Sequence, residues 1–213
     1  MRGELLRGLE ALGIEAGEAQ VDRLIRYLEL LAKWNRVYNL TAITEPRRMV
    51  SHHLLDSLAI LPWLPQQGRL LDVGTGAGLP GIPLAVMRPE TDWVLLDSNG
   101  KKTRFVQQAI AELGLGRAKV VRSRVQDYHA NAPADEAAFD VVLSRAYASL
   151  LDFARSADHL WSRSTRLMTL KTEPEETELS ALRERGVRID ITRLAVPGID
   201  APRSLVILER QDS

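Results

Sequence analysis

A glycine-rich stretch in the middle of the chain is the first candidate for a ligand site. Residues 70–84 read LLDVGTGAGLPGIPL, so four glycines fall within eight positions between two apolar runs. Glycine has no Cβ atom to keep a ligand away from the backbone, and it adopts φ angles that other residues avoid. In an open α/β sheet, ligands bind at the carboxyl ends of the strands, where this loop would lie. The stretch therefore predicts a binding site for a nucleotide-like cofactor.

Two ligand classes fit this loop. Residues 76–81 match the G-x-G-x-x-G fingerprint of dinucleotide-binding proteins, but the match starts four residues after Asp72 and not directly after the strand. The other phasing, D-V-G-x-G-x-G, resembles the first motif of S-adenosylmethionine-dependent methyltransferases. A carboxylate at the strand end would repel a pyrophosphate and would suit a ligand that carries an ammonium or sulfonium group. This phasing favours S-adenosylmethionine, with Asp72, Gly76 and Gly78 as candidate contacts.

A second acid, Asp97, ends the apolar run that follows the glycine loop. An acid at the end of a second strand can accept hydrogen bonds from both hydroxyls of a ribose. The alternative role for Asp97 is to cap the helix that begins near Ser98. We expect Asp97 to contact the cofactor under either phasing of the loop.

The elements that must position these residues divide the chain in two. Residues 1–64 read as helices, the last over 46–61, because apolar residues recur at spacings of three and four; they predict an N-terminal helical cap. From residue 69 short apolar runs alternate with helical stretches, which predicts a mostly parallel sheet in a three-layer α/β domain over residues 65–213. The two parts are expected to form one compact unit. The expected strands are 70–73, 93–97, 118–122, 140–144 and 167–171, with an antiparallel pair at 187–191 and 204–208.

The composition excludes several other classes of function. The chain has 28 Lys and Arg residues against 28 Asp and Glu residues, so net charge gives no sign of binding to naked nucleic acid. It has no cysteine and only four histidines, so we expect no metal site. No apolar run approaches the roughly 20 residues that span a bilayer. These features predict a cytoplasmic protein without membrane contact, which we expect to be a monomer.

Five segments together are far more selective than the glycine loop alone. KWNRVYNLTAI, HHLLDSL, DVGTGAGLPGIPLA, VLLDSNGKKTRFV and VVLSRAYASL resemble the RsmG (GidB) family of methyltransferases, and the resemblance covers about residues 15–210. That family methylates N7 of a guanine in bacterial small-subunit (16S) ribosomal RNA. The resemblance implies a Rossmann-like class I methyltransferase fold with a seven-stranded sheet, S-adenosylmethionine as cofactor and S-adenosylhomocysteine as product. It also implies that the RNA is free or part of the small ribosomal subunit.

The resemblance also implies which residues contact the cofactor. They are Gly74, Leu79, Val125, Gln126 and Arg145 in this sequence. Gln126 stands where a glutamate is common, a departure from the family pattern at the hydrogen bond to the adenine side, and Val125 is expected to contribute through its backbone amide.

The chemistry at N7 of guanine needs few protein groups. N7 carries a free lone pair in the plane of the ring, so no general base is expected, and catalysis would come from alignment of the reacting atoms. Arg145 could donate to guanine O6, to a phosphate or to the cofactor carboxylate, and the sequence does not choose among these. Its alternative role is a surface ion pair.

An RNA substrate predicts basic and aromatic side chains near the methyl group. Trp34 and Tyr38 could stack on a splayed base, although Trp34 also completes an apolar helix stripe. His52 and Asp56, four residues apart, are expected to form a pair on a helix surface. Each basic residue could equally be a solvated surface charge. The candidates are Lys101, Lys102, Arg104, His53, Lys171 and Arg203.

Three other functions remain open at this stage. A small-molecule methyltransferase would have an enclosed apolar pocket over the methyl group. An assembly factor that binds RNA without catalysis would lack cofactor binding. A nucleotide-dependent oxidoreductase is disfavoured by Asp72 before the loop.

Overall fold

The computed structural model describes residues 1–129, 139–145, 147 and 149–211. Its centre is a seven-stranded sheet in the order β3-β2-β1-β4-β5-β7-β6. The first five strands run parallel, whereas β7 runs antiparallel to both of its neighbours. The strands are β1 (Gly68–Val73), β2 (Thr91–Asp97), β3 (Ala118–Arg122), β4 (Val141–Ser144), β5 (Arg166–Lys171), β6 (Val187–Leu194) and β7 (Arg203–Arg210).

All seven strands expected from the sequence occur, and no bound differs by more than three residues. The predicted antiparallel pair is also confirmed, with β7 inserted between β5 and the edge strand β6. The central strands are buried on both faces, so their near-continuous apolar runs identified them.

Helices cover both faces of this sheet. One buried cluster joins the helical cap, α5 (Gly81–Met87) and α6 (Gly100–Leu113) to one face, and Leu70 and Leu95 belong to it. A second cluster joins α7 (Leu150–Ser156) and α8 (Glu176–Arg183) to the other face, through residues such as Leu71 and Leu96. Successive strand residues therefore alternate between the two layers, as a pleated sheet requires.

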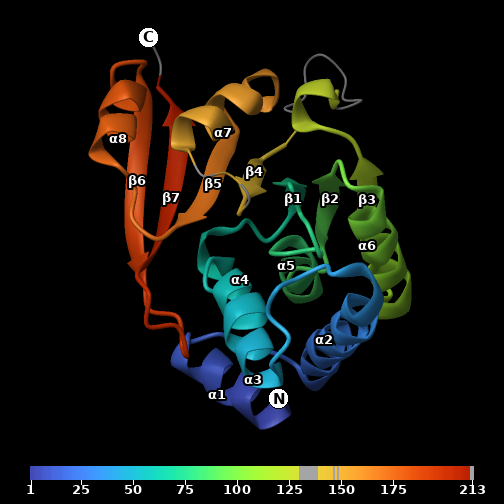
Figure 1. Ribbon diagram of the computed structural model, residues 1–213. Coiled ribbons are helices and arrows are strands. Elements are labelled where there is room, and N and C mark those ends of the chain that lie inside the picture. Colours follow the sequence, from blue (N-terminus) through green and yellow to red (C-terminus); the bar gives the residue numbers. More distant parts are fainter. Residues whose placement is uncertain (130–138, 146, 148, 212–213) are drawn as a thin grey trace.

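The helical cap packs directly on the sheet domain. It contains α1 (Arg2–Ala11) and α2 (Glu18–Tyr38), and Figure 1 shows α2, in blue, near α5 and α6. Contacts join α2 to both α5 and α6, and α4 (Asp56–Leu58) to α5. The layer of helices on this face of the sheet is therefore built from α5, α6 and the N-terminal helices together.

The single helix expected over residues 46–61 is wrong. The structure has α3 (Pro46–Met49), then a π-helix over Val50–Leu55, then α4. The hydroxyl of Ser51 donates to the carbonyl of Arg48 at 3.3 Å, and that of Ser57 donates to the carbonyl of His53 at 2.5 Å. Such side-chain bonds compete with the regular α-helical pattern. A short 3₁₀ turn at Leu61–Trp63, with Pro62 inside it, leads into β1.

Candidate functional site

The glycine loop leads from β1 into α5, and its first residues bond to the end of β2. The backbone N–H groups of Gly74 and Thr75 both donate to the carbonyl of Leu96, at 2.8 and 2.9 Å. Gly78 has a φ of +87°, and a Cβ atom there would lie 2.4 Å from Cδ1 of Ile82. Only glycine fits this position without movement of a neighbour. The loop therefore presents bare backbone at the carboxyl end of the sheet.

Asp72 lies beneath this loop and is fully buried. Its Oδ2 accepts hydrogen bonds from the Thr75 hydroxyl at 2.7 Å and from the Gly81 N–H at 2.9 Å, whereas its Oδ1 has no partner. Burial raises the pKa of this carboxyl to about 6. The prediction that Asp72 contacts the cofactor directly does not fit this structure. Its carboxylate is buried beneath the loop, on the side that faces away from solvent.

Asp97, at the end of β2, is also largely buried and bonds to the glycine loop at Gly76. Its Oδ2 accepts from the Gly76 N–H and its Oδ1 from the Asn99 N–H, both at 2.8 Å. The helix-capping alternative belongs to Asn99 instead, whose Oδ1 accepts from the N–H groups of Lys101 and Lys102 at the start of α6. The two backbone donors fix the Asp97 carboxylate, and its remaining lone pairs can accept from a ligand.

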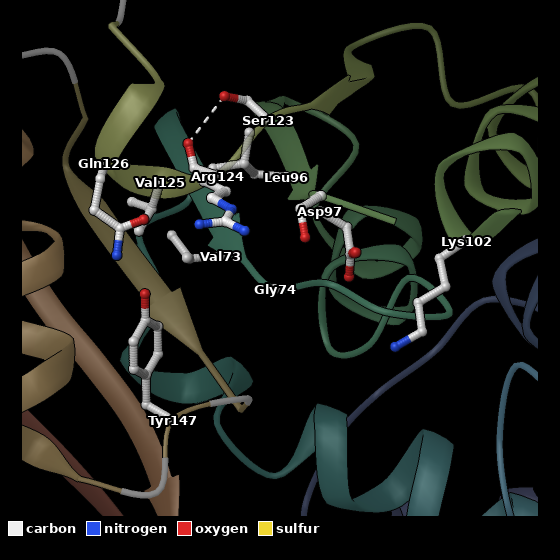
Figure 2. A pocket seen from close by; sticks show the side chains of 11 residues that line it. Val73, Gly74, Leu96, Asp97, Lys102, Ser123, Arg124, Val125, Gln126 and Tyr147 are labelled. Carbon is white, nitrogen blue, oxygen red and sulfur yellow. Dashed lines mark hydrogen bonds between the residues drawn. The ribbon is translucent and has the colours of Figure 1, made fainter. Parts of the chain in front are cut away.

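A cavity of about 290 Å³ opens beside Asp97, at the carboxyl ends of β1, β2 and β3. Figure 2 shows Asp97 and Lys102 on one side of it and Gln126 and Tyr147 on the other. The position is the one expected for a cofactor in an open α/β sheet. The lining residues are Val73, Gly74, Leu96, Asp97, Ser98, Lys102, Ser123, Arg124, Val125, Gln126 and Tyr147.

Four of the nine predicted cofactor contacts line this cavity, namely Gly74, Asp97, Val125 and Gln126. Gly76, Gly78 and Leu79 belong to the loop itself, and the Leu79 side chain is buried in the core. Val125 is buried within a short 3₁₀ turn, Val125–Asp127. The exposed Gln126 amide donates to the Ser156 hydroxyl at 3.3 Å, so it leans towards α7.

The predicted cofactor contacts did not include Tyr147, Ser123 or Arg124 of the cavity wall, because these residues follow strands without forming a motif. Sequence reasoning also missed Tyr27, which is fully buried in α2. The Tyr27 hydroxyl donates to the Ala77 carbonyl at 2.7 Å and so ties the helical cap to the glycine loop. No local signal in the sequence announces a contact between residues 50 positions apart.

Arg145 lies outside the described cavity and contacts the helical cap. Its Nη1 lies 3.1 Å from Oδ2 of Asp56 and donates to the His52 carbonyl at 3.3 Å. The expected pair of His52 and Asp56 is wrong, because Asp56 pairs with arginines and His52 Nδ1 lies 2.8 Å from the Ser51 hydroxyl. Arg145 therefore forms an ion pair, the alternative role given for it, but the pair is partly buried and does not lie on an open surface.

His53 points into the protein and not towards a substrate. It is buried, and its Nε2 lies 3.1 Å from the hydroxyl of Thr41, whose backbone is held by the Asn35 side chain. Burial, together with the nearby Arg145 charge, lowers the pKa of His53 to about 4. The prediction that His53 contacts RNA is therefore wrong for this structure, and a neutral imidazole ties the π-helix to the segment after α2.

The other predicted RNA contacts fall into three groups. Lys101 and Arg104 are exposed on α6, next to Lys102 in the cavity wall. Lys171 donates to the Tyr147 carbonyl at 2.8 Å and so holds the segment after β4. Arg203, at the start of β7, binds Asp56 with its Nε at 2.9 Å.

The predicted stacking residues pack largely against the protein. The ring of Trp34 lies 5.3 Å from Tyr38 and 5.7 Å from Phe105, between ring centroids. Tyr38 is 40% exposed, whereas Trp34 packs against the main core cluster. Tyr38 is therefore the more exposed ring of this pair.

Within the described residues, no group of three potential metal ligands comes together. The described helices also include none that is long and apolar enough to cross a membrane.

Comparisons with known proteins give one consistent result. Residues 20–206 match the family model of GidB, described as rRNA small subunit methyltransferase G. The chain is 49% identical over 209 residues to the ribosomal RNA small subunit methyltransferase G of Ectopseudomonas mendocina, covering 97% of this chain and 95% of that protein. It is 50% identical over 205 residues to the protein of the same name from Methylococcus capsulatus, covering 96% and 97%.

Solved structures agree on the fold. A SAM-dependent methyltransferase from Aquifex aeolicus superposes with a TM-score of 0.57 at 17% sequence identity, covering 84% of this chain and 97% of that one. The expected class I methyltransferase fold is confirmed.

Proposed function

The chain belongs to the rRNA small subunit methyltransferase G (GidB) family and is an S-adenosylmethionine-dependent methyltransferase of 16S ribosomal RNA, and we propose that it methylates N7 of one guanine without a general base. The observation that carries the proposal is the Asp97 carboxylate, which lines the cavity beside the bare glycine loop. The choice of guanine N7 comes from the family resemblance described above.

The residues present fit the cofactor. Asp97 offers lone pairs for two ribose hydroxyls, and its carboxylate is already oriented by Gly76 and Asn99. Gly74 and Val125 line the same cavity; Gly74 precedes Asp97 in the sequence and Val125 follows it. When bound, S-adenosylmethionine supplies an electrophilic methyl group on a sulfonium centre. The glycine loop presents backbone atoms, and no bulky side chain, to the cofactor.

The chain's own contribution to the reaction is alignment. Among the described lining residues, the titratable side chains are Asp97, Lys102, Arg124 and Tyr147. None of them is needed to take a proton, because the lone pair of N7 is free before transfer. A nucleophile held in line with the methyl group gains rate by proximity alone. Arg145, placed at the end of β4 next to β1, is the candidate residue for orienting the reacting groups.

The RNA approaches, in this proposal, across the start of α6. Lys101, Arg104 and Arg122 line a hollow of about 320 Å³ next to the cavity, with Asn99 and Gly100 at the helix start. The positive side chains there can contact phosphates, although the whole chain has equal numbers of positive and negative residues. We therefore propose that an assembled or assembling small subunit, and not naked RNA, is the preferred substrate of a monomeric, metal-independent enzyme.

The test is methyl transfer from labelled S-adenosylmethionine to small-subunit RNA, offered as naked transcript and as particle. Label on N7 of a single guanine, located by nuclease digestion, is the expected result, with more label on the particle. Label on another atom, or on several guanines, would contradict the proposed specificity. Transfer to the transcript alone would contradict the proposed partner.

A further inference from the structure

A second hollow lies at the end of the sheet opposite the cofactor cavity. Its volume is about 460 Å³, against about 290 Å³ for the cofactor cavity, and none of the site residues predicted from the sequence lines it. Its charged and aromatic lining residues are Arg155, Asp158, Trp161, Arg163, Arg185 and Arg210. We call it the arginine hollow, because four arginines and one acid stand among the described residues of its wall.

The strand pairing fixes the position of the arginine hollow. Val187, the first residue of β6, lies opposite Arg210, the last residue of β7, and Leu208 of β7 lies opposite Leu167 near the start of β5. Strand β5 runs parallel to β1, β2 and β3, whose carboxyl ends border the cofactor cavity. The arginine hollow is therefore at the amino end of the parallel strands. Figure 1 shows this end of β7, beside the C-terminus, near α7 and α8 and away from the helical cap.

The two ends of the sheet are too far apart for one nucleotide to reach both. The eight residues of β7 span about 24 Å at a rise of about 3.4 Å per residue. A ligand in the arginine hollow therefore does not touch the base that receives the methyl group.

Arg210 is held in place by two neighbours. The Trp161 side chain beneath it is 5% exposed, and its Nε1 donates to the Thr165 carbonyl at 3.1 Å. The guanidinium carbon of Arg210 lies 5.0 Å from the centre of the Trp161 ring, and its Nη2 pairs with Asp158. The Arg210 side chain nevertheless remains 39% exposed. A planar guanidinium group that is already oriented loses little freedom when it binds an anion.

Arg185 and Arg155 leave hydrogen-bond donors available. Arg185 is exposed in the turn between α8 and β6, and within the described part of the chain its side chain makes no hydrogen bond or ion pair. Arg155, in α7, lies 3.6 Å from Asp152, and both of these side chains are more than 60% exposed. Such an exposed pair contributes little in water. Exposed guanidinium donors favour oxyanions, and phosphate above all, because two parallel hydrogen bonds form at once.

We propose that the arginine hollow binds the phosphate backbone of a second segment of the small-subunit RNA, remote from the guanine that is methylated. The inference rests on the proposed function, because it needs an RNA that is folded so that both segments meet one protein. Contact at the hollow raises the effective concentration of the target guanine at the cofactor cavity. A folded particle presents the two segments together, which gives a physical reason for the proposed preference for particles over naked transcript.

The character of the hollow favours a polymer over a small metabolite. Its arginine side chains remain exposed, whereas a site for a small molecule encloses most of its ligand. A ribosomal RNA presents a phosphate at every nucleotide, so several guanidinium groups can bind neighbouring phosphates of one strand. An acidic protein segment would also satisfy the arginines, and the cross-linking experiment below separates it from RNA.

The first experiment measures binding of Arg185→Gln and of the double variant Arg155→Gln/Arg185→Gln to small-subunit particles at several salt concentrations. We expect Arg185→Gln to weaken binding about fivefold. The slope of log affinity against log salt should fall in magnitude by about one in the single variant and by about two in the double variant. Because the hollow is remote from the cofactor cavity, KM for the particle should rise, whereas kcat and the affinity for S-adenosylhomocysteine should stay unchanged.

Arg7→Gln is the matched control. Arg7 is an exposed arginine on α1 in the helical cap, and its side chain likewise has no hydrogen bond or ion pair among the described residues. Its loss removes the same charge at another place, so the particle affinity should equal that of the wild-type protein. Equal weakening by Arg7→Gln and Arg185→Gln would overturn the site, since only total charge would then matter. An unchanged salt slope in Arg185→Gln would overturn it as well.

The absence of cysteine from the sequence allows the partner at the hollow to be identified. Arg185→Cys introduces a single thiol, to which a photoreactive group is attached before the protein is mixed with small-subunit particles. We expect cross-links to 16S ribosomal RNA, at nucleotides away from the methylated guanine, and fewer RNA cross-links from Arg7→Cys labelled in the same way. Cross-links to a ribosomal protein alone would contradict an RNA ligand, as would a yield of RNA cross-links no higher than that of Arg7→Cys.

The outcomes also separate this inference from the proposed function. A wild-type protein that methylates particles, together with an Arg185→Gln variant that binds them normally, refutes the arginine hollow only. Methylation of naked transcript alone, with weaker transcript binding by Arg185→Gln, refutes the proposed preference for particles and keeps the hollow as an RNA site. A wild-type protein that neither binds nor methylates small-subunit RNA refutes the proposed function, and the role of the hollow with it.

Discussion

At the scale of single residues, Asp97 combines a structural role with a binding role. Both oxygens accept backbone hydrogen bonds, and the same carboxylate faces the cavity. In Asp97→Asn one acceptor oxygen becomes a donor, which opposes either a backbone N–H or a ribose hydroxyl. We expect affinity for S-adenosylhomocysteine to fall about 10- to 100-fold, the usual effect of losing a hydrogen bond to a charged group. Isothermal titration calorimetry measures this directly.

Asp92→Asn is the control for that measurement. Asp92 lies on the same strand, is exposed, and pairs with Arg117 at 3.0 Å away from the cavity. Its cofactor affinity should match that of the wild-type protein. An Asp97→Asn variant that binds as tightly as Asp92→Asn would remove Asp97 from the site.

Asp72 makes the stability of the protein depend on pH. Burial raises its pKa from 3.8 to about 6, so the folded state holds this proton more tightly than the unfolded state does. The contribution of Asp72 to stability is therefore greatest below pH 3.8 and is lost as the pH rises through 6. The lowered pKa of His53 acts in the opposite direction over a similar range, so the wild-type curve alone does not isolate Asp72.

The Asp72→Asn variant isolates the contribution of Asp72 to the pH dependence of stability, because the amide does not titrate. We expect the free energy of unfolding of Asp72→Asn, relative to wild type, to increase by about 1 to 3 kcal/mol between pH 4 and pH 7. Urea denaturation at several pH values gives this difference. A constant difference across the range would show that Asp72 keeps an ordinary pKa in the fold.

At the scale of elements, the start of α6 depends on one side chain. Asn99 accepts hydrogen bonds from the N–H groups of Lys101 and Lys102, which places Lys102 in the cavity wall and Lys101 in the neighbouring hollow. Asn99→Ala should lower the free energy of unfolding by about 1 kcal/mol, as expected for loss of an N-cap. Asn99→Ser, which keeps a capping oxygen, should retain most of the stability. Equal urea midpoints for Asn99→Ala and wild type would exclude the cap.

Regular elements were predictable because their signals are local. Strands β1 to β5 follow from apolar runs and the loop between β1 and α5 from its glycines, all within short windows of sequence. The stretch of residues 50–58 was not predictable in the same way. Hydroxyl groups of Ser51 and Ser57 bond to carbonyls of the preceding turn, and this local competition left no mark on the apolar pattern.

At the scale of the whole molecule, the helical cap and the sheet should unfold together. They share one buried cluster, and Tyr27 of the cap holds the glycine loop at Ala77. Tryptophan fluorescence and circular dichroism should therefore report one coincident transition. S-adenosylhomocysteine at about 100 times its Kd should stabilise the protein by about 2.7 kcal/mol and raise Tm by about 5 to 10 °C. Two transitions, with only one shifted by ligand, would contradict a single unit.

Contacts between distant parts of the chain account for what the sequence did not reveal about the site. Asp56 and Arg203 are 147 positions apart, and only the strand order β4-β5-β7 brings Arg203 next to Arg145. His53 looked like a surface residue because its partner Thr41 lies in a loop without regular structure. Asp97 and the glycine loop could be predicted because each stands at the end of an apolar strand. The signal for each therefore lies within one short window of sequence.

The bond between Tyr27 and Ala77 limits how this fold could be recombined. A chimaera that joined this sheet to the N-terminal helices of a distant relative would keep every residue of the cavity wall. If those helices lacked Tyr27 and Asp56, the chimaera would lose the phenol that bonds to the glycine loop and the carboxylate that holds Arg145 and Arg203. The methyltransferase half is therefore not a portable module, and exchange between family members has to carry the helices and the sheet as one block.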